Sequence, residues 1–334
     1  MKGTCLDDRY LLGESLGAGG HGQVFLARDT KLGRDVAIKM LKEEPHPASL
    51  ARLRREAAVL ADIQHPNVVF ILDVGADYVV MQRLSGPSLA QLAYDRRPFP
   101  FDEAARHGVA IAGALTVLHT RPDPIVHRDI KPGNLVLDGD VIKLCDFGLA
   151  RKPLGGLTPV TQTGHVLGTP GYMSPEQLDD LDPAPPADVY ALGATLYNVL
   201  CGKPPFGLED GLNAYLQRVT AEEPPSLLDR RPDVPRDLAN LIHRMLAIDP
   251  ADRPDSAQVR DALADLGGAG AAAEAVTARL TEQFAQVQAL FAEGKEARAA
   301  FALVRLLGRA QAALGSEHQL VRRMNAYADL RRTR

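Results

Sequence analysis

A glycine-rich run near the start of the chain could bind phosphate. Gly17, Gly19 and Gly22 lie in the sequence GAGGHGQV, which ends at Val24. Because glycine has no Cβ, backbone N–H groups in such a run can approach phosphate oxygens closely. A dinucleotide-binding turn would lead directly into a helix, whereas Gln23–Asp29 has the apolar alternation of a strand. The run therefore indicates a phosphate-binding hairpin between two strands.

Five further motifs carry residues that can act on a phosphate or a hydroxyl. Carboxylates can accept a proton from a hydroxyl, and carboxylate and phosphate oxygens are the hard ligands that Mg²⁺ prefers. In chain order the motifs are VAIK (36–39), followed by RREAA (54–58); HRDIKPGN (127–134); DFG (146–148), behind a strand-like run at 141–144; GTPGYMSPE (168–176); and DVYALG (188–193).

Together the six motifs resemble those of the eukaryotic-type (Hanks-type) serine/threonine protein kinases, over about residues 10–266. The octet at 127–134 is the most specific of them, since all eight positions follow the family pattern. The resemblance implies an enzyme that transfers the γ-phosphoryl group of ATP to serine or threonine hydroxyls of proteins. It implies ATP with Mg²⁺, or Mn²⁺ in its place, as cofactors. The bias toward Ala, Gly, Pro and Arg favours a bacterial member.

By this resemblance, Asp129 accepts or orients the proton of the substrate hydroxyl, and Lys131 lies against the γ-phosphate. A lysine at this position is typical of serine/threonine-directed members. Lys39 pairs with Glu56 and points at the α- and β-phosphates. Asn134 and Asp146 are the expected magnesium ligands.

The resemblance also places the nucleotide and the protein substrate. Thr169 is expected to dock the substrate. Gln82 departs from the family, which commonly has Glu there, but hinge contacts use the main chain. The expected nucleotide-binding residues are Gly17, Gly19, Gly22 and Lys39 for the phosphates; Val24, Ala37 and Val136 around adenine; Met81 as gatekeeper; and Gln82 and Leu84 as hinge backbone groups.

Arg128 precedes Asp129, a pattern typical of kinases that are switched on by phosphorylation of the activation loop. A phosphate there could pair with Arg128 through charge-assisted hydrogen bonds. The candidates are Thr158, Thr161 and Thr163, of which the last two lie nearer Thr169. A polar loop that merely contains threonines is the alternative.

Two other classes of function remain open. A pseudokinase keeps the fold as a binding scaffold and usually lacks the lysine or one of the aspartates, yet Lys39, Asp129 and Asp146 are all present. A small-molecule kinase of related fold tends to lack a segment like 168–176, which builds a protein-docking shelf. Incubation with labelled ATP, magnesium and a generic protein substrate distinguishes these classes from a protein kinase.

The resemblance implies an α+β, two-lobed fold for residues 10–266, with ATP between the lobes. Residues 10–82 form a lobe of antiparallel strands with one helix at about 49–63, and residues 85–266 form a larger helical lobe. Two structural contacts are expected in the larger lobe. Asp188 braces the backbone of the 127–134 loop, and Arg253 pairs with Glu176.

A separate all-α extension is predicted at 274–331, after a glycine-rich linker at 267–273. Leu280, Phe284, Val287 and Phe291 recur at spacings of four, three and four residues, which lines one face of a helix. Gly294 is expected to end this helix, and similar patterns around 303–314 and 320–327 predict two more. A docking or regulatory role, self-association, and simple packing against the large lobe all remain open.

Composition sets the remaining limits. The net charge of −4 gives no global positive field for nucleic acid, and no run of 18 apolar residues predicts a membrane span in this chain. Cys5, Cys145 and Cys201 form no CxxC pair, which favours a reducing, cytoplasmic location. Protein substrates are the expected partners.

Overall fold

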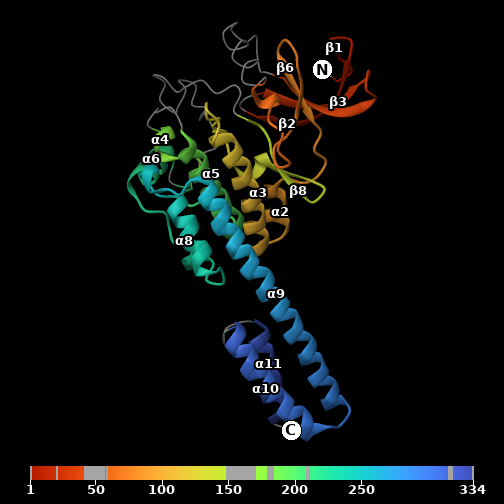
Figure 1. The fold of residues 1–334 in the computed structure, drawn as a ribbon, viewed down its shortest axis with the longest axis vertical. Coiled ribbons are helices and arrows are strands. Elements are labelled where there is room, and N and C mark those ends of the chain that lie inside the picture. Colours follow the sequence, from red (N-terminus) through yellow and green to blue (C-terminus); the bar gives the residue numbers. More distant parts are fainter. Residues whose placement is uncertain are drawn as a thin grey trace. The chain divides into compact units, whose positions relative to one another are not determined.

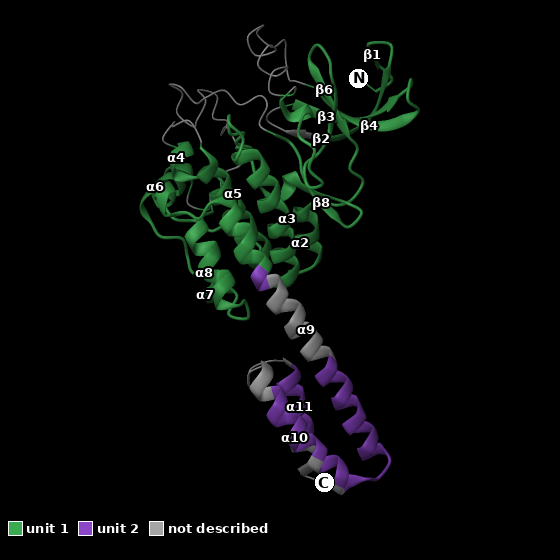
Figure 2. Ribbon diagram, viewed as in Figure 1, with its two compact units in different colours: residues 1–264 green, residues 265–334 purple. Residues whose placement is uncertain are grey.

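The computed structural model describes residues 2–19, 22–40, 57, 59–147, 171–178, 184–207, 209, 211–314 and 319–332. It divides into two compact units, residues 1–264 and 265–334 (Figure 2). The first unit contains the predicted sheet and the larger helical lobe, and the second is all helical (Figure 1).

An antiparallel sheet of six strands forms the N-terminal lobe, in the order β1-β2-β3-β4-β6-β5. β2, β3 and β4 follow one another as hairpins, as the alternation of apolar residues predicts. Of the helix expected at 49–63, residues 57 and 59–61 are helical and residues 62 and 63 are not, while 49–56 and 58 lie outside the described residues. The strands are β1 (Cys5–Leu6), β2 (Tyr10–Gly19), β3 (Gly22–Asp29), β4 (Arg34–Met40), β5 (Ile71–Val74) and β6 (Tyr78–Gln82).

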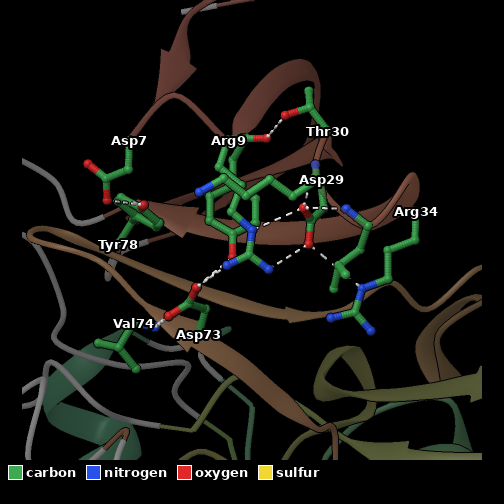
Figure 3. A network of polar contacts seen from close by, with 11 residues as sticks. Asp7, Arg9, Asp29, Thr30, Arg34, Asp73, Val74 and Tyr78 are labelled. Atoms are coloured by element: carbon green, nitrogen blue, oxygen red, sulfur yellow. Dashed lines mark hydrogen bonds and ion pairs between the residues drawn. The ribbon is translucent and has the colours of Figure 1, made fainter.

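A polar network closes one end of this sheet (Figure 3). Arg9 donates to both carboxylate oxygens of Asp29, at 3.0 and 2.9 Å, and to Asp73 at 3.0 Å. Tyr10 donates its hydroxyl to the same Asp73 oxygen at 2.6 Å. The contacts therefore join the start of β2 to the end of β3 and to β5, which are distant in sequence.

Helices α3 and α5 form the centre of the larger lobe, and α8 packs on α5. Most side chains of α5 are buried, so this helix is apolar on nearly all sides. The elements of this lobe are α2 (Leu89–Asp95), α3 (Phe101–His119), β7 (Leu135–Asp138), β8 (Val141–Leu144), α4 (Pro175–Leu178), α5 (Pro185–Cys201), α6 (Leu212–Ala221), α7 (Leu227–Arg230), α8 (Arg236–Met245), the start of α9 (Ser256–Ala292), and 3₁₀ turns at Pro132–Asn134 and Pro250–Asp252.

The linker expected at 267–273 is helical, so the prediction of a break there was wrong. Helix α9 runs without interruption from Ser256 to Ala292, and the division between the two units falls inside it. Each glycine costs a helix about 1 kcal/mol relative to alanine but does not forbid it. The segment contains no proline, and alanines at 269 and 271–273 favour the helix.

The second unit is a set of three helices with its own apolar core. Gly294 adopts a left-handed φ of 74°, and Lys295 donates to the carbonyl of Leu290 at 3.0 Å, which ends α9 in a Schellman motif. Helices α10 (Glu296–Leu314) and α11 (Gln319–Arg332) follow, so the three predicted helices and the break at Gly294 are confirmed. The buried core comprises Leu280, Phe284, Val287, Leu303, Leu306, Ala310, Leu320, Val321 and Met324.

No helix within the described ranges is long and apolar enough to cross a lipid bilayer.

Candidate active site

One face of the N-terminal sheet collects four of the residues predicted to bind a nucleotide. Val24 lies opposite Lys39 in the β3–β4 register, and Ala37 lies opposite Met81 in the β4–β6 register. Opposed residues of antiparallel strands share a face, and so do Ala37 and Lys39, two apart on one strand. The other face forms the lobe's apolar core, which includes Phe25, Ile38 and Val80 among others.

The glycine-rich run is the turn of the β2–β3 hairpin, as predicted. Gly19 pairs with Gly22, and Gly17 pairs with Val24. Gly22 has a φ of 144°, which side chains with a Cβ rarely adopt, so glycine is required there for a conformational reason. The run leads into a strand, which excludes the helix that a dinucleotide fingerprint would need.

Lys39 lies buried in β4, with 6% of its surface exposed, and forms an ion pair with Asp146. A buried ammonium needs such a partner, because an unpaired buried charge is costly. The expected partner Glu56 lies outside the described residues. Asp146 has a φ of 62°, an unfavourable value for a residue other than glycine. Such backbone strain is often found at functional sites.

The loop at 127–134 brings three predicted residues together. Lys131 Nζ lies 2.9 Å from Asp129 Oδ2, and Asn134 Nδ2 donates to the same oxygen at 2.9 Å. Asn134 also donates to the Asp129 main-chain carbonyl at 2.7 Å. The short 3₁₀ turn Pro132–Asn134 folds the chain back, so that the amide reaches the carboxylate. A carboxylate held in this way is fixed in both position and orientation.

Asp188 braces this loop from the start of α5, as predicted. Its carboxylate accepts from the main-chain N–H groups of His127 at 2.7 Å and Arg128 at 2.9 Å, and lies 3.0 Å from His119 Nε2. Arg128 has a left-handed φ of 69°, which the brace helps to hold. Burial alone would raise the pKa of Asp188, but hydrogen bonds and the charge of His119 outweigh it and lower that pKa.

The segment after β6, where the hinge is expected, is bound to β7. Gly86 N–H donates to the Leu137 carbonyl at 3.1 Å, and Leu137 N–H donates to the Pro87 carbonyl at 3.0 Å. Ser88 pairs with Val136, which places Val136 beside the connection that contains Leu84. Val136 in the larger lobe and Met81 in β6, both predicted to bind the nucleotide, are therefore connected through this one segment.

The segment that is predicted to dock the substrate is anchored at Glu176 by the predicted ion pair. Arg253 donates to both carboxylate oxygens of Glu176, at 2.6 and 2.8 Å, and its side chain is fully buried. It also donates to three main-chain carbonyls, so its charge is well compensated. Thr169 and the candidates Thr158, Thr161 and Thr163 lie outside the described residues.

The comparisons with known proteins agree with this geometry. Residues 10–263 match the family described as the protein kinase domain. The chain belongs to this family. It is 37% identical over 266 residues to the serine/threonine-protein kinase PknB of Mycobacterium leprae, covering 75% of this chain and 42% of that protein. It is 35% identical over 275 residues to a probable serine/threonine-protein kinase of Clostridium acetobutylicum, covering 80% of this chain and 41% of that protein.

A solved structure that contains a bound nucleotide analogue is similar in fold. The solved structure of Rad53 residues 1–466 in complex with AMP-PNP is 25% identical, with a TM-score of 0.60. It matches 75% of this chain and 64% of its own. The α+β, two-lobed fold is therefore that of protein kinases. This chain spans about two-fifths of the length of the curated relatives, 41–42%.

The kinase-domain residues Asn134 and Asp146 fit a magnesium ion. Asn134 uses its amide nitrogen on Asp129, which leaves the amide oxygen as the atom able to bind a cation. Cys145 N–H donates to the Asn134 carbonyl at 2.9 Å. Asp146 is the next residue after Cys145, so this hydrogen bond holds it close to Asn134. One amide oxygen and one carboxylate, completed by phosphate oxygens and water, form an oxygen set that suits Mg²⁺.

Two neighbours of this site are structural. His127 is fully buried, and its ring lies 4.5 Å from that of Phe147, centroid to centroid. Burial lowers the pKa of His127, which favours the neutral ring expected of a packing residue. Burial also raises the pKa of the Cys145 thiol to about 12, so this thiol is expected to be chemically inert.

Sequence reasoning missed several supporting residues. His119 reaches Asp188, and Tyr215 accepts the Gly171 N–H at 2.9 Å in the docking segment. Gln177 accepts from both Ser174 N and its hydroxyl, at 3.1 and 3.2 Å. His119 ends α3, where a histidine is favourable for the helix alone, so the sequence offered no distinct signal.

Proposed function

We propose that this chain is a serine/threonine protein kinase, which transfers the γ-phosphoryl group of ATP to serine or threonine hydroxyls of proteins. The observation that carries the proposal is the Asp129 carboxylate, held 2.9 Å from Lys131 Nζ and 2.9 Å from Asn134 Nδ2. The serine/threonine-directed names of the relatives and the presence of Lys131 support the substrate class.

In this proposal each residue has one chemical task. Asp129 orients the substrate hydroxyl and takes its proton as the oxygen attacks the γ-phosphorus. Lys131 stabilises the negative charge on the transferred group, and Lys39 holds the other phosphates. Asn134 and Asp146 would hold Mg²⁺, or Mn²⁺ in its place, which when bound neutralises charge on the phosphate oxygens. Transfer to the hydroxyl breaks the bond between the γ-phosphorus and the bridging oxygen, so ADP leaves.

Incubation of the protein with γ-labelled ATP, magnesium and a generic protein substrate tests this proposal. We expect labelled phosphoserine and phosphothreonine and no phosphotyrosine. Nucleotide binding without transfer to any protein would instead support the pseudokinase alternative. Transfer to a small molecule alone would support the other rival class.

We further propose regulation by autophosphorylation at Thr158, Thr161 or Thr163. Arg128 follows the buried His127 and precedes Asp129, so a phosphate bonded to it would act on the loop that carries the base. Mass spectrometry of the freshly expressed protein should show phosphate on one of these threonines, favouring Thr161 or Thr163. Fully active protein with all three unmodified would contradict the regulation but not the kinase activity.

The cellular location of the protein and its binding partners are proposals as well. The described cysteines Cys5, Cys145 and Cys201 are free thiols, which suits a reducing cytoplasm. We propose protein substrates as the partners, with docking or self-association through α10 and α11 as a second role. Pull-down with this chain and with a variant ending at residue 268 would test that role. A partner that binds these helices should be recovered with the longer chain and not with the shorter one.

A further inference from the structure

The side chain of Gln82 joins the two lobes at the hinge. Gln82 is the last residue of β6, and its Nε2 donates to Asp138 Oδ2 at 2.7 Å. Asp138 is the last residue of β7, the strand that contains Val136. The Gln82 main-chain N–H donates to the Phe70 carbonyl at 2.9 Å, so its backbone is held within the N-terminal lobe. The amide therefore connects that lobe's last strand with the larger lobe.

Other contacts bind the segment after β6 to β7 through the main chain. Gly86 and Pro87 bond to Leu137 through the main chain. A Cβ on Gly86 would lie 2.5 Å from the Leu137 carbonyl oxygen, so the two segments are in close contact. Residues 86–88 are thus bound to β7, while residue 82 reaches β7 only through its side chain.

The chemistry at this contact requires an amide. An ionised carboxylate accepts hydrogen bonds only, so Asp138 is matched by a donor such as the Gln82 amide and not by a second carboxylate. The other amide atom, Gln82 Oε1, is buried and has no hydrogen-bond partner among the described residues. A glutamate here would set two carboxylates at hydrogen-bond distance and bury a second oxygen without a donor. The family's common Glu at position 82 would therefore be unfavourable while Asp138 faces it.

We propose that Gln82 is a positioning residue for the nucleotide, matched to Asp138. It holds the hinge main chain at the distance from Val136 that adenine needs. This inference rests on the proposed function only in assuming that ATP binds at this hinge. Because Gln82 and Asp138 act on the hinge and not on the reacting atoms, the pair affects nucleotide affinity more than the turnover rate.

The test compares full-length wild type with Gln82→Glu, Asp138→Asn and the double variant. Calorimetry gives the Kd for magnesium and a non-hydrolysable ATP analogue, and steady-state kinetics give KM for ATP and kcat. We expect Gln82→Glu to raise Kd and KM by about tenfold, because a charged group is left without a donor. Asp138→Asn alone should stay within about threefold, since its amide oxygen still accepts from Gln82.

The double variant decides the matter. In that protein the carboxylate introduced at position 82 would accept from the amide introduced at position 138. The exchange of donor and acceptor leaves the size of both side chains unchanged, so affinity should return to within about threefold of wild type. Failure of this rescue, or a Kd for Gln82→Glu equal to that of wild type, would overturn this inference and leave the proposed function intact. If wild type bound no nucleotide, the proposed function would fail as well.

An uncharged variant provides a second test in case Gln82→Glu does not fold. Gln82→Ala removes the donor to Asp138 without adding a second negative charge, and it should raise Kd by several-fold with little effect on kcat. If Gln82→Glu does not fold, this variant carries the test, and an unchanged Kd would then overturn the inference.

Discussion

Asp129 and Asp146 both carry a carboxylate in the candidate active site, and we propose separate tasks for them because their contacts differ. Asp129 touches Lys131 and Asn134, whereas Asp146 touches Lys39. We expect Asp129→Asn to lower kcat by about 10²–10⁴-fold while nucleotide still binds, because only the hydroxyl side is affected. Asp146→Asn should instead lose magnesium-dependent nucleotide affinity. Calorimetry beside steady-state kinetics separates the two, and near-normal turnover of Asp129→Asn would show that the base is misassigned.

Among single residues, the sequence predicted those that belong to a family motif, including the distant pair Arg253–Glu176, and missed contacts between residues outside those motifs. Asp129, Lys131 and Asn134 are within six positions of one another, so their type and spacing carried the information. Gln82 and Asp138 are 56 positions apart, and His119 and Asp188 are 69 apart. A single glutamine or histidine has many uses, and only the folded chain brings its partner within 3 Å.

The packing of α5 against α8 explains the glycine of the motif at 188–193. A Cβ on Gly193 would lie 2.9 Å from the Met245 Cβ, which leaves no room for a methyl group. We expect Gly193→Ala to lower the free energy of unfolding by about 1–3 kcal/mol through overpacking. Gly113→Ala in α3 is the matched control, because its Cβ would meet only Arg260 Cδ at 3.8 Å. Helix propensity should make this control neutral or stabilising by about 1 kcal/mol.

Urea unfolding of the two variants checks this prediction. Equal destabilisation of both would show that contact between α5 and α8 does not explain the glycine.

The network around Arg9 predicts a pH effect on the sheet. Hydrogen bonds from Arg9 hold the pKa of Asp29 at about 2, against the opposing effect of burial. The unfolded value is about 4, so the folded carboxylate holds its proton less tightly. The stabilisation is therefore fully present above about pH 4 and is lost as the pH falls toward about 2. Arg9→Gln should remove most of this acid dependence.

Urea midpoints measured from pH 7 down to 3 test the effect. Lys2→Gln is the control, because the Lys2–Glu14 pair is about three-quarters exposed on both sides, 73% and 77%. Wild type and Arg9→Gln with the same slope against pH would contradict the role of Arg9.

Elements were predicted best where apolar periodicity was strong, and the error in α9 shows why. The glycines at 267, 268 and 270 indicated a linker, yet α9 continues through them. Glycine lowers the stability of a helix by a finite amount, whereas proline removes a hydrogen bond and clashes with the preceding turn. Glycine alone therefore leaves the outcome to the surrounding residues. Gly294 did end the helix, because there a left-handed residue and the following turn satisfy the last carbonyls.

For the whole molecule, the two units have separate cores. The core of residues 265–334 includes Phe284, Leu306 and Met324, and the core of the N-terminal sheet includes Phe25, Ile38 and Val80. The residues that we propose to be catalytic belong to the first unit and lie between Lys39 and Asp146 in sequence. We therefore expect thermal unfolding of the full chain in two transitions, of which only one responds to nucleotide.

Phe284→Ala tests this expectation. Phe284 is 3% exposed, and its ring packs edge-on against Tyr327 with centroids 5.5 Å apart. Its loss should cost the second unit about 3–5 kcal/mol, enough to lower or abolish that unit's transition in calorimetry. Val304→Ala is the control, since Val304 is 65% exposed in the same unit and its truncation should change stability by less than about 0.5 kcal/mol. Kinase activity and the nucleotide-sensitive transition should stay unchanged in both variants. A joint shift of both transitions in Phe284→Ala would mean that the units unfold together, and a loss of activity with it would mean that the helical unit supports catalysis.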